Sequence, residues 1–539
     1  MADHSRQLSE KSISAPSTPE KKTQVGGYAG PAGVEVDLPP MVLKDGIRLH
    51  PQPTSDPLDP LNWTSLKKHT ILAVVMALYF MFTYITTTTV PSFPELQEQY
   101  GLSLAQVNWT VAVPALGLAV GPLIWSSLAD IYGRRVIFIV GTIIALASTI
   151  GAALAPTYSG YMAARFFQGL GVSPAATVGL AIINDCFFEY QRGAKVGLWV
   201  LAIDIGLLVG PLIGGFIDLV SSAWIQWLTA ILFGVILLAE IFVMPETLYP
   251  RNTMLTRMPY TVGNAAAADI EKTQPLPSVA TDTDLPRTTK LPYINFKPVP
   301  GMRHPKPWDS LVRFFITFKF SVVTAAIGIY CVGWYWWILS VITFLPVAYI
   351  QYTPQQQGLL FIGLILGTLV AEFAMSGALS DKIIMRLSKK NNGIRVAEMR
   401  LWLAYPAALL SAIGLIVWGI SVDRAWHWMV GQVAFFLFAA GIQTGNTIIA
   451  AYIVDCYPLQ SMSMITFYAV LLNLSAFVNP FFIAPWIETS GFTWTFAVQG
   501  IITFAFSVPA LAAVHYWGPA LRARNGTPNW VNPEFDTII

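Results

Sequence analysis

Charged side chains are scarce in this sequence. Asp, Glu, Lys and Arg make up 12% of the 539 residues, whereas 54% are hydrophobic. About a quarter of the residues in a typical soluble domain are charged, so this composition excludes an ordinary soluble protein. The formal net charge is only +2, which gives no reason to expect a nucleic-acid partner.

Cysteine and histidine are also rare. The three cysteines (Cys186, Cys331 and Cys456) lie in or beside apolar segments and imply no disulfide framework. The six histidines are scattered, and no metal-ligand spacing, phosphate-binding loop or nucleophile triad stands out. We therefore expect neither enzymatic activity nor a cofactor or metal. Any process that needs energy would therefore be driven by an ion gradient or by the gradient of a substrate.

Long hydrophobic runs are what the sequence has in abundance. Runs of about 20 residues can each cross a hydrocarbon core of about 30 Å. They begin near residues 70, 107, 136, 160, 196 and 222, and again near 317, 355, 398, 427, 461 and 493. The pattern predicts an all-α integral membrane protein. Its twelve transmembrane helices would form two six-helix bundles, residues 66–245 and 313–517.

Polar segments flank and separate the predicted bundles. We expect residues 1–65 and 518–539 to form tails, the first of them disordered, and residues 246–312 to form a flexible linker. The short loops on one side hold ten basic residues, and the loops on the other side hold only Arg424. This asymmetry predicts that both termini are cytoplasmic. The plasma membrane is the expected location, with vacuolar and vesicular membranes as alternatives.

The two halves resemble each other in sequence. The second helix ends in Ser127–Asp130 (SLAD) and the eighth in Ala378–Asp381 (ALSD). The fourth ends in Asn184–Phe187 (NDCF) and the tenth in Val454–Tyr457 (VDCY). Two matches in the same order indicate duplicated, pseudo-symmetric bundles. In transporters this arrangement places the binding site near the membrane midplane, between the halves.

The fifth predicted helix is unusually rich in glycine. It reads GLWVLAIDIGLLVGPLIGG, with Pro211 surrounded by Gly197, Gly206, Gly210, Gly214 and Gly215. In water each glycine would cost roughly 1 kcal/mol and the proline roughly 3 kcal/mol. In a bilayer, small residues instead let helices pack closely. Because Gly206, Gly210 and Gly214 lie four residues apart, they share a face and predict a close-packed wall.

A charged turn follows the second helix. Asp130 stands just before Gly133, Arg134 and Arg135, and Asp381 occupies the matching position in the second half. An acid beside two guanidinium groups can latch two helix ends together and release them when the ends separate. We therefore predict a gate here. The alternative is that Arg134 and Arg135 only fix the topology.

A few charged residues lie inside the apolar spans. We predict that Arg165, Asp204 and Glu372 couple the protein to protons, because buried carboxylates can bind and release protons near neutral pH. Glu240 is expected at the membrane interface, near a helix end. Arg165 could instead extend to the outer interface. Asp204 and Glu372 could instead make only structural hydrogen bonds.

Polar and aromatic residues within the spans predict a cavity for an organic substrate. Trp334 begins a run of four aromatic residues in the seventh helix. The predicted polar anchors of the cavity are Gln168, Gln443, Asn446 and Asn473. The alternatives are an interfacial aromatic belt and ordinary hydrogen bonds between helices.

Together these motifs resemble those of the major facilitator superfamily, over about residues 56–520. The stretch from Asp130 to Arg135 is similar to the family's loop signature G-x-L-A-D-R-x-G-R-R. Ser126 replaces its first glycine and Ile131 its first arginine, departures that would weaken the latch. The segment Arg165–Gly171 resembles the helix-four signature that the family links to proton coupling.

The fifth helix resembles the antiporter signature G-x8-G-x3-G-P-x2-G-G at every fixed position. Residues 59–63 (DPLNW) and 245–247 (PET) are similar to fungal members of the twelve-span antiporter group. The resemblance implies a major facilitator fold that works by alternating access. It would export a drug, toxin or secondary metabolite from a lipid bilayer in exchange for protons, and function as a monomer.

Two other functions fit the sequence. One is an importer or facilitator of a small nutrient, whose transport would not depend on a proton gradient. The other is a membrane receptor or scaffold that transports nothing, against which the predicted coupling and gating residues argue.

Overall fold

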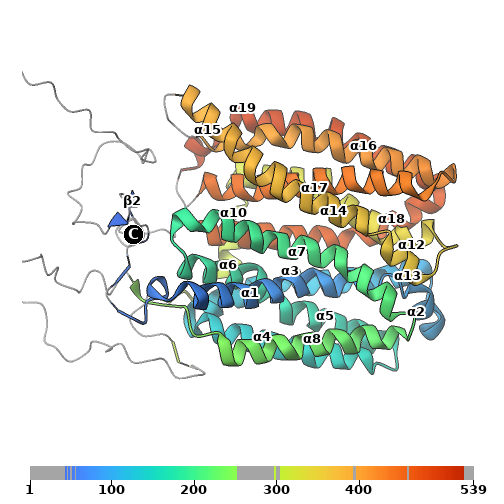
Figure 1. The fold of residues 1–539 in the computed structure, drawn as a ribbon, viewed down its shortest axis with the longest axis horizontal. Coiled ribbons are helices and arrows are strands. Elements are labelled where there is room, and N and C mark those ends of the chain that lie inside the picture. The colour runs from blue at the N-terminus through green and yellow to red at the C-terminus, as the bar shows by residue number, and fades with distance from the viewer. Residues whose placement is uncertain are drawn as a thin grey trace, which may run out of the picture.

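The computed structural model describes residues 43–44, 47–48, 51, 53–54, 56–251, 297–298, 304–391, 396–457 and 460–526. Helices form nearly all of its regular structure (Figure 1). Within the described part, the exceptions are two-residue strands, β1 (Leu43–Lys44) and β2 (Ile47–Arg48), which pair antiparallel. The predicted all-α membrane class is confirmed.

The first half of the chain forms six membrane passes, coloured blue to green in the lower part of Figure 1. A short helix, α2 (Phe93–Tyr100), joins the first two passes. The passes are α1 (Ser65–Thr87), α3 (Leu104–Tyr132), α4 (Arg134–Ala153), α5 and α6 (Tyr158–Val172 and Pro174–Cys186), α7 (Glu189–Ile217) and α8 (Ser222–Val243).

The second half follows a short helix, α10 (Asp309–Thr317), and lies above the first in Figure 1. Its seventh and eighth passes each contain a π-helical segment, a feature often found at functional sites. The seventh comprises α11 (Ser321–Tyr330), the π-helix η2 (Cys331–Tyr335) and α12 (Trp336–Ala348). The eighth comprises α13 (Pro354–Leu359), α14 (Ile362–Val370), the π-helix η3 (Ala371–Leu379) and α15 (Ser380–Lys390).

The last four passes complete the second bundle. They are η4 with α16 (Ala397–Leu403 and Ala404–Asp423), α17 (Trp428–Cys456), and α18 with α19 (Ser461–Ala505 and Ser507–Asn525). Eleven described helical stretches are long and apolar enough to cross a membrane, and the last, Met462–Asn525, has 64 residues. A straight helix of that length would extend about 96 Å, three times the hydrocarbon core. It breaks at Gly491, where φ is +71°, so it accounts for two passes and brings the total to the predicted twelve.

The two ends of the molecule differ in their elements. One end, at the left in Figure 1, carries α10, α15 and the turn before Arg134; we call it the basic end. The opposite end carries α2 and α13; we call it the far end.

Hydroxyl groups of α1 bond to the backbone of α7 where a proline interrupts that helix. Pro211 has no N–H, so the carbonyl of Leu207, four residues earlier, loses its helical partner. The Thr87 hydroxyl donates to this carbonyl at 2.8 Å. One turn away, the Thr83 hydroxyl donates to the carbonyl of Ile203. Neighbouring side chains thus satisfy the groups that a proline leaves open within the bilayer.

Replacing Thr87 with valine should therefore lower stability by about 1 kcal/mol or more, because a buried carbonyl loses its only described donor. The measurement is thermal unfolding in lipid nanodiscs, with the exposed Thr70→Val change as control. In a Pro211→Ala background the carbonyl of Leu207 regains a backbone donor, so the same valine should cost less. An equal cost in both backgrounds would contradict this role for Thr87.

Candidate functional site

Asp204 lies near the middle of α7 and is held by the other half of the molecule. The Asn446 amide on α17 donates to both carboxylate oxygens of Asp204, at 3.1 Å each. The Tyr468 hydroxyl on α18 donates to the Asn446 carbonyl oxygen at 2.5 Å. Asp204 keeps part of its surface accessible. This acid of the first bundle therefore faces the interface with the second.

Glu372 reaches across the same interface from the opposite side. It lies in the π-helix η3, and its Oε2 accepts hydrogen bonds from the Gln443 amide at 2.9 Å and the Thr447 hydroxyl at 2.8 Å. Its Oε1 lies 3.4 Å from the point that a Cβ on Gly197 would occupy. The first glycine of the α7 motif therefore lies beside the carboxylate of the other bundle, at a distance where a Cβ would make ordinary van der Waals contact.

The helix α17 brings the two predicted acids together. Gln443 lies beside both carboxylates, and Asn446, on the same face, holds Asp204. The sequence pattern marked these two amides but not Thr447 or Tyr468, because hydroxyl side chains are common in apolar helices. Only the spacing of residues 443, 446 and 447, which places them on one face of the helix, pointed to Thr447.

Aromatic rings surround Asp204. Tyr79 and Tyr335 lie close enough to its carboxylate to interact with it electrostatically. Tyr79 also stacks on Trp199, with ring centroids 4.1 Å apart. Trp334 is fully buried, 6.1 Å from the ring of Tyr330, and its ring lies 3.4 Å from the position that a Cβ on Gly445 would occupy. Tyr335 and Trp337 are also buried and Trp336 is half-buried, so the aromatic run of the seventh pass packs mainly inside the protein.

Asn473 and Gln168 do not join this cluster. The Asn473 amide donates to the carbonyl of Ala469 in its own helix at 2.7 Å. Gln168 is buried inside the first bundle, where its amide donates to Thr149 at 2.8 Å and to Gln226 at 3.4 Å. Both residues hydrogen-bond within one bundle.

Arg165 is also confined to the first bundle. Its guanidinium is completely buried and donates to the carbonyl of Thr110 at 3.3 and 3.4 Å and to Gln168 at 2.7 Å. Pro114, four residues after Thr110, lacks the N–H that would otherwise bond this carbonyl. Arg165 thus supplies hydrogen bonds to a backbone carbonyl of α3 that has no helical donor. The alternative that Arg165 extends to the outer interface is wrong.

Glu240 lies three residues before the end of α8, near a helix end as expected. It is also fully buried in the protein and accepts a hydrogen bond from the Thr142 hydroxyl of α4 at 2.8 Å. A neighbouring helix thus supplies a polar partner inside the bundle. The carboxylate remains within the first half of the chain.

The glycine face of α7 packs directly on the backbone of α1. A Cβ on Gly206 would lie 2.2 Å from the carbonyl oxygen of Phe80, and one on Gly214 would lie 2.0 Å from that of Thr88. Gly210 packs on the Thr87 hydroxyl in the same way, at 2.7 Å. No side chain larger than hydrogen fits these three positions without displacing α1.

Gly215 faces the other bundle. A Cβ on it would lie 2.3 Å from the carbonyl oxygen of Pro354, the first residue of α13. Conversely, Gly358 packs on the backbone of Pro211 and Leu212. The motif helix therefore contacts α1 with one face and, at the far end, the second bundle with another.

At the basic end, Arg134 binds two acids of its own bundle. It forms an ion pair with Asp130, one turn earlier, and its Nε lies 3.5 Å from Asp185 at the end of α6. Arg135 donates to the carbonyl of Ile241 at 2.6 Å. The side chain of Asp381 lies outside the described residues.

Glu246 caps the same turn, and sequence analysis did not single it out. Its carboxylate accepts the backbone N–H groups of Arg134 at 2.9 Å and of Arg135 at 3.1 Å, at the positive end of α4. Gly133 has φ +106°, and a Cβ there would lie 2.3 Å from Glu246 Oε2. The PET segment after α8 was the sequence signal for this contact.

The second half repeats this ion pair. Arg400, just before α16, pairs with Asp455 at the end of α17 at 2.5 Å. Arg134 and Asp185 hold the corresponding positions in the first half, at the start of the third pass and the end of the fourth. The NDCF and VDCY segments therefore supply matching acids at matching places.

Residues just before α1 are anchored at the basic end. Asp59, completely buried, caps the short 3-10 helix η1 (Pro60–Asn62) and pairs with Arg251 at 2.9 Å. Burial opposes its ionisation. Nevertheless Arg251 and the N–H groups of Thr54 and Leu61 hold the pKa of Asp59 below its ordinary value.

The Asp59→Asn change should therefore lower thermal stability at neutral pH but not in strong acid. A lowered carboxyl pKa stabilises the fold above about pH 4, and this contribution disappears as the pH falls through the folded-state value. Unfolding temperatures of the two proteins should differ at neutral pH and converge as the pH falls below about 4, with the exposed Glu98→Gln change as control. A difference that stays constant with pH would contradict the ion pair's role.

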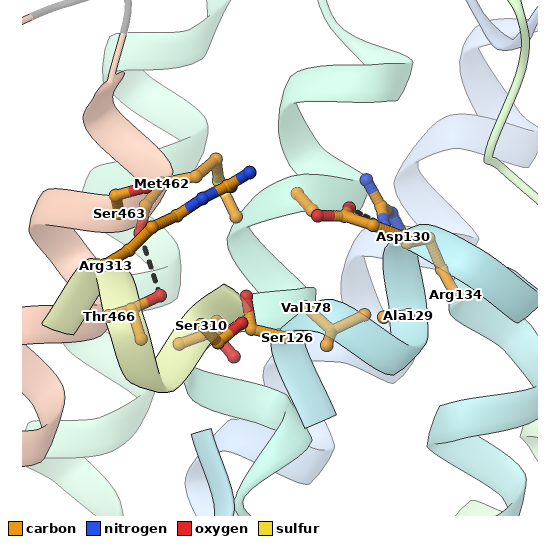
Figure 2. Close-up of a pocket in the computed structure, with 12 residues that line it drawn as sticks. Ser126, Ala129, Asp130, Arg134, Val178, Ser310, Arg313, Met462, Ser463 and Thr466 are labelled. Atoms are coloured by element: carbon orange, nitrogen blue, oxygen red, sulfur yellow. Dashed lines mark hydrogen bonds and ion pairs between the residues drawn. The ribbon is translucent and has the colours of Figure 1, made fainter. Parts of the chain in front are cut away.

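A small cavity of about 60 Å³ lies at the basic end between the halves. Figure 2 shows Asp130 and Arg134 on one wall and Arg313 of α10 on the other. The Ser127 hydroxyl accepts the Ser310 N–H at 2.9 Å, and the two hydroxyls lie 2.6 Å apart. These bonds fasten α10 to α3 and close this side of the interface.

Residues 74–458, more than half of the chain, match the family model described as Major Facilitator Superfamily. The chain belongs to this superfamily. Its members are transporters of small molecules in lipid bilayers and not enzymes. Among the described residues, no group of three or more His, Cys, Asp or Glu side chains could hold a metal ion.

Fungal relatives of the superfamily match most of the chain. Protein HOL1 of Saccharomyces cerevisiae is 26% identical, over 88% of this chain and 90% of its own length. Efflux pump radE of Floropilus chiversii is 29% identical, over 87% of this chain and 83% of its own. MFS-type transporter penM of Penicillium rubens is 26% identical, over 88% and 91%.

Two solved structures of the superfamily share the fold. The xylose transporter XylE from Escherichia coli, in a partially occluded inward-open conformation, has a TM-score of 0.57 at 14% identity, covering 84% of this chain and 98% of its own. The human organic anion transporter MFSD10 has a TM-score of 0.52 at 16% identity, covering 82% and 99%.

Proposed function

We propose that this chain exports a small organic compound in exchange for protons, by alternating access between its two bundles. The observation that carries the proposal is the pair of carboxylates at the interface. Asp204 of the first half is held by Asn446 of the second, and Glu372 of the second lies against Gly197 of the first. Rocking one bundle against the other would separate these contacts and change the surroundings of both acids.

Each carboxylate would carry a proton in one conformation and lose it in the other. A proton neutralises the acid and weakens its attraction for a cationic or polar substrate, so protonation and substrate binding would exclude each other. Arg165 would support this exchange indirectly, by fixing α3 and α5 within the first bundle. The close-packed α1–α7 wall would keep protons from leaking past the site.

We propose that transport runs outward, from the basic end to the far end. We place the basic end in the cytoplasm, with both termini, the tails and the linker on that side, in the plasma membrane. Asp130, Arg134 and Arg135 would form the inner gate with the matching Asp381 region. The far end, sealed by Gly215 against α13, would release the substrate. Relatives named efflux pumps, including radE and Probable efflux pump mfs2 of Aspergillus flavus, support export. We propose that the chain works as a monomer.

Everted membrane vesicles that contain the full chain test this function. With an acidic interior imposed, an acridine dye reports the pH gradient while candidate compounds of positive, negative and zero charge are added. At least one compound should dissipate the gradient and accumulate inside, and vesicles without the chain should show neither effect. Accumulation that is independent of the imposed gradient would show a facilitator and contradict proton exchange.

A further inference from the structure

The acids at the interface have no positive partner in the described part of the chain. Its ion pairs involve Arg134, Arg251, Arg400 and Arg522 but neither Asp204 nor Glu372. Arg165 is held by Thr110 and Gln168 in the first bundle. Removing a carboxylate from water is costly unless a counter-charge or a proton compensates it. Around Asp204 and Glu372 the interface therefore has two sites for positive charge, and no described residue pairs with either.

The side-chain amides around Asp204 and Glu372 turn their NH2 groups toward the carboxylates, which accept hydrogen bonds from them. Because Tyr468 donates to the carbonyl oxygen of Asn446, the NH2 group of this amide is turned toward Asp204. Gln443 likewise donates to Glu372, and Thr447 adds its hydroxyl. Amide and hydroxyl donors can orient an ionised acid without neutralising it, which leaves its charge available to a ligand.

Aromatic rings lie beside these acids. Tyr79 stacks on Trp199, and the rings of Tyr330 and Tyr468 lie 6.0 Å apart. Faces of such rings attract ammonium groups, more strongly when water is excluded. Along α7, Gly197 and Asp204 are two helical turns apart, about 10 Å. An elongated cation could thus contact both carboxylates, and a compact one either of them.

We propose that Asp204 and Glu372, at the interface between the bundles, bind a small organic cation, bearing a protonated amine or a quaternary onium group, as the transported substrate. This inference rests on the proposed transport function and specifies its substrate class. The carboxylates supply the charge recognition, and the aromatic rings contact the organic body. An anion of equal size would be repelled by both acids.

Binding to the purified full chain in lipid nanodiscs tests the substrate class. The cationic probes are tetraphenylphosphonium, spermidine and choline, and tetraphenylborate provides an anion with the shape of the first. At least one cation should bind saturably, and the borate should not bind at this site. Asp204→Asn and Glu372→Gln should each weaken the binding of that cation at least tenfold.

A matched control comes from the buried acid of the first bundle. Glu240→Gln removes a carboxylate that bonds only to Thr142 and should leave cation affinity unchanged. Thermal unfolding of each variant shows whether it is folded. Failure of all three cations to bind would overturn the proposal, as would equal affinity for the borate or undiminished binding in both carboxylate variants.

The vesicle experiment separates this inference from the transport function. If a neutral or anionic compound dissipates the pH gradient while no cation binds, proton-coupled export stands and the cation site is wrong. If cations bind through Asp204 but no compound moves protons, the cation site stands and proton exchange is wrong.

Discussion

Replacing Asp204 with asparagine is expected to abolish proton-coupled transport. Asn446 holds this carboxylate from the opposite bundle, and no other group in the described part of α7 offers a negative charge at that place. Truncating one member of a buried, hydrogen-bonded charge interaction costs about 2–5 kcal/mol, which corresponds to a loss of roughly 30-fold to several thousand-fold. Compound-induced dissipation of the pH gradient in everted vesicles measures the loss.

Glu240→Gln is the control for this prediction. It removes a buried acid of the same bundle, and it should keep most of the activity because Thr142 bonds to the glutamine oxygen equally well. The amount of each variant in the membrane is compared by immunoblot. An Asp204→Asn protein that dissipates the gradient at more than half the wild-type rate would remove Asp204 from the coupling mechanism.

Replacing Gly214 with leucine is expected to stop transport by a different route. The new Cβ would lie 2.0 Å from the carbonyl oxygen of Thr88, so α1 and α7 must separate along the whole glycine face. Overpacking of this kind typically costs about 1–3 kcal/mol in a core. Because α7 also contacts α13 at the far end, the displacement reaches the seal between the bundles. Transport should fall below detection while the protein remains in the membrane.

Gly234 provides the matched control for this change. It lies in the membrane helix α8, and a Cβ there meets nothing within 4 Å, so Gly234→Leu should transport normally. Comparison of the two leucine variants separates the effect of packing from that of added hydrophobicity. Normal transport by Gly214→Leu would refute the packing role of the glycine face.

The sequence alone predicted the architecture well, because hydrophobic length decides membrane passes. The twelve passes and the break between the halves follow from apolar runs and need no knowledge of contacts. The apolar runs that begin near residues 461 and 493 predicted the last two passes, but not how the chain turns at Gly491 between them. Residues 462–525 form one apolar stretch of nearly continuous helix, and the reversal depends on the backbone angle of a single glycine.

Partners of the predicted site residues could not be derived in the same way. The spacing of the glycines predicted a face for close packing, but not that α1 would occupy it. Because it is charged, Arg165 was expected to face the protein interior. Its partner there, the Thr110 carbonyl that has no helical donor because of Pro114, could not be predicted. Such contacts depend on the register between helices, which periodicity within one helix does not determine.

The acids at the interface lie between these two cases. Their positions inside apolar spans marked Asp204 and Glu372, and the amides Gln443 and Asn446 were recognisable as polar groups in an apolar helix. That one face of α17 holds both acids became evident only in three dimensions. Gln168 is also a polar residue in an apolar helix, but it bonds to Thr149 inside the first bundle. The sequence pattern does not identify the neighbouring helix.

Proton release on cation binding is the most direct test of whether the same carboxylates bind protons and substrate. The titratable groups that face Asp204 are Glu372 and the phenols of Tyr79, Tyr330, Tyr335 and Tyr468. In weakly buffered nanodiscs near neutral pH, adding the cation that binds most tightly among tetraphenylphosphonium, spermidine and choline should release protons from the wild-type chain. Asp204→Asn should release markedly fewer protons. Saturable cation binding without proton release, or equal release from Asp204→Asn, would contradict an exchange of protons for substrate at this site.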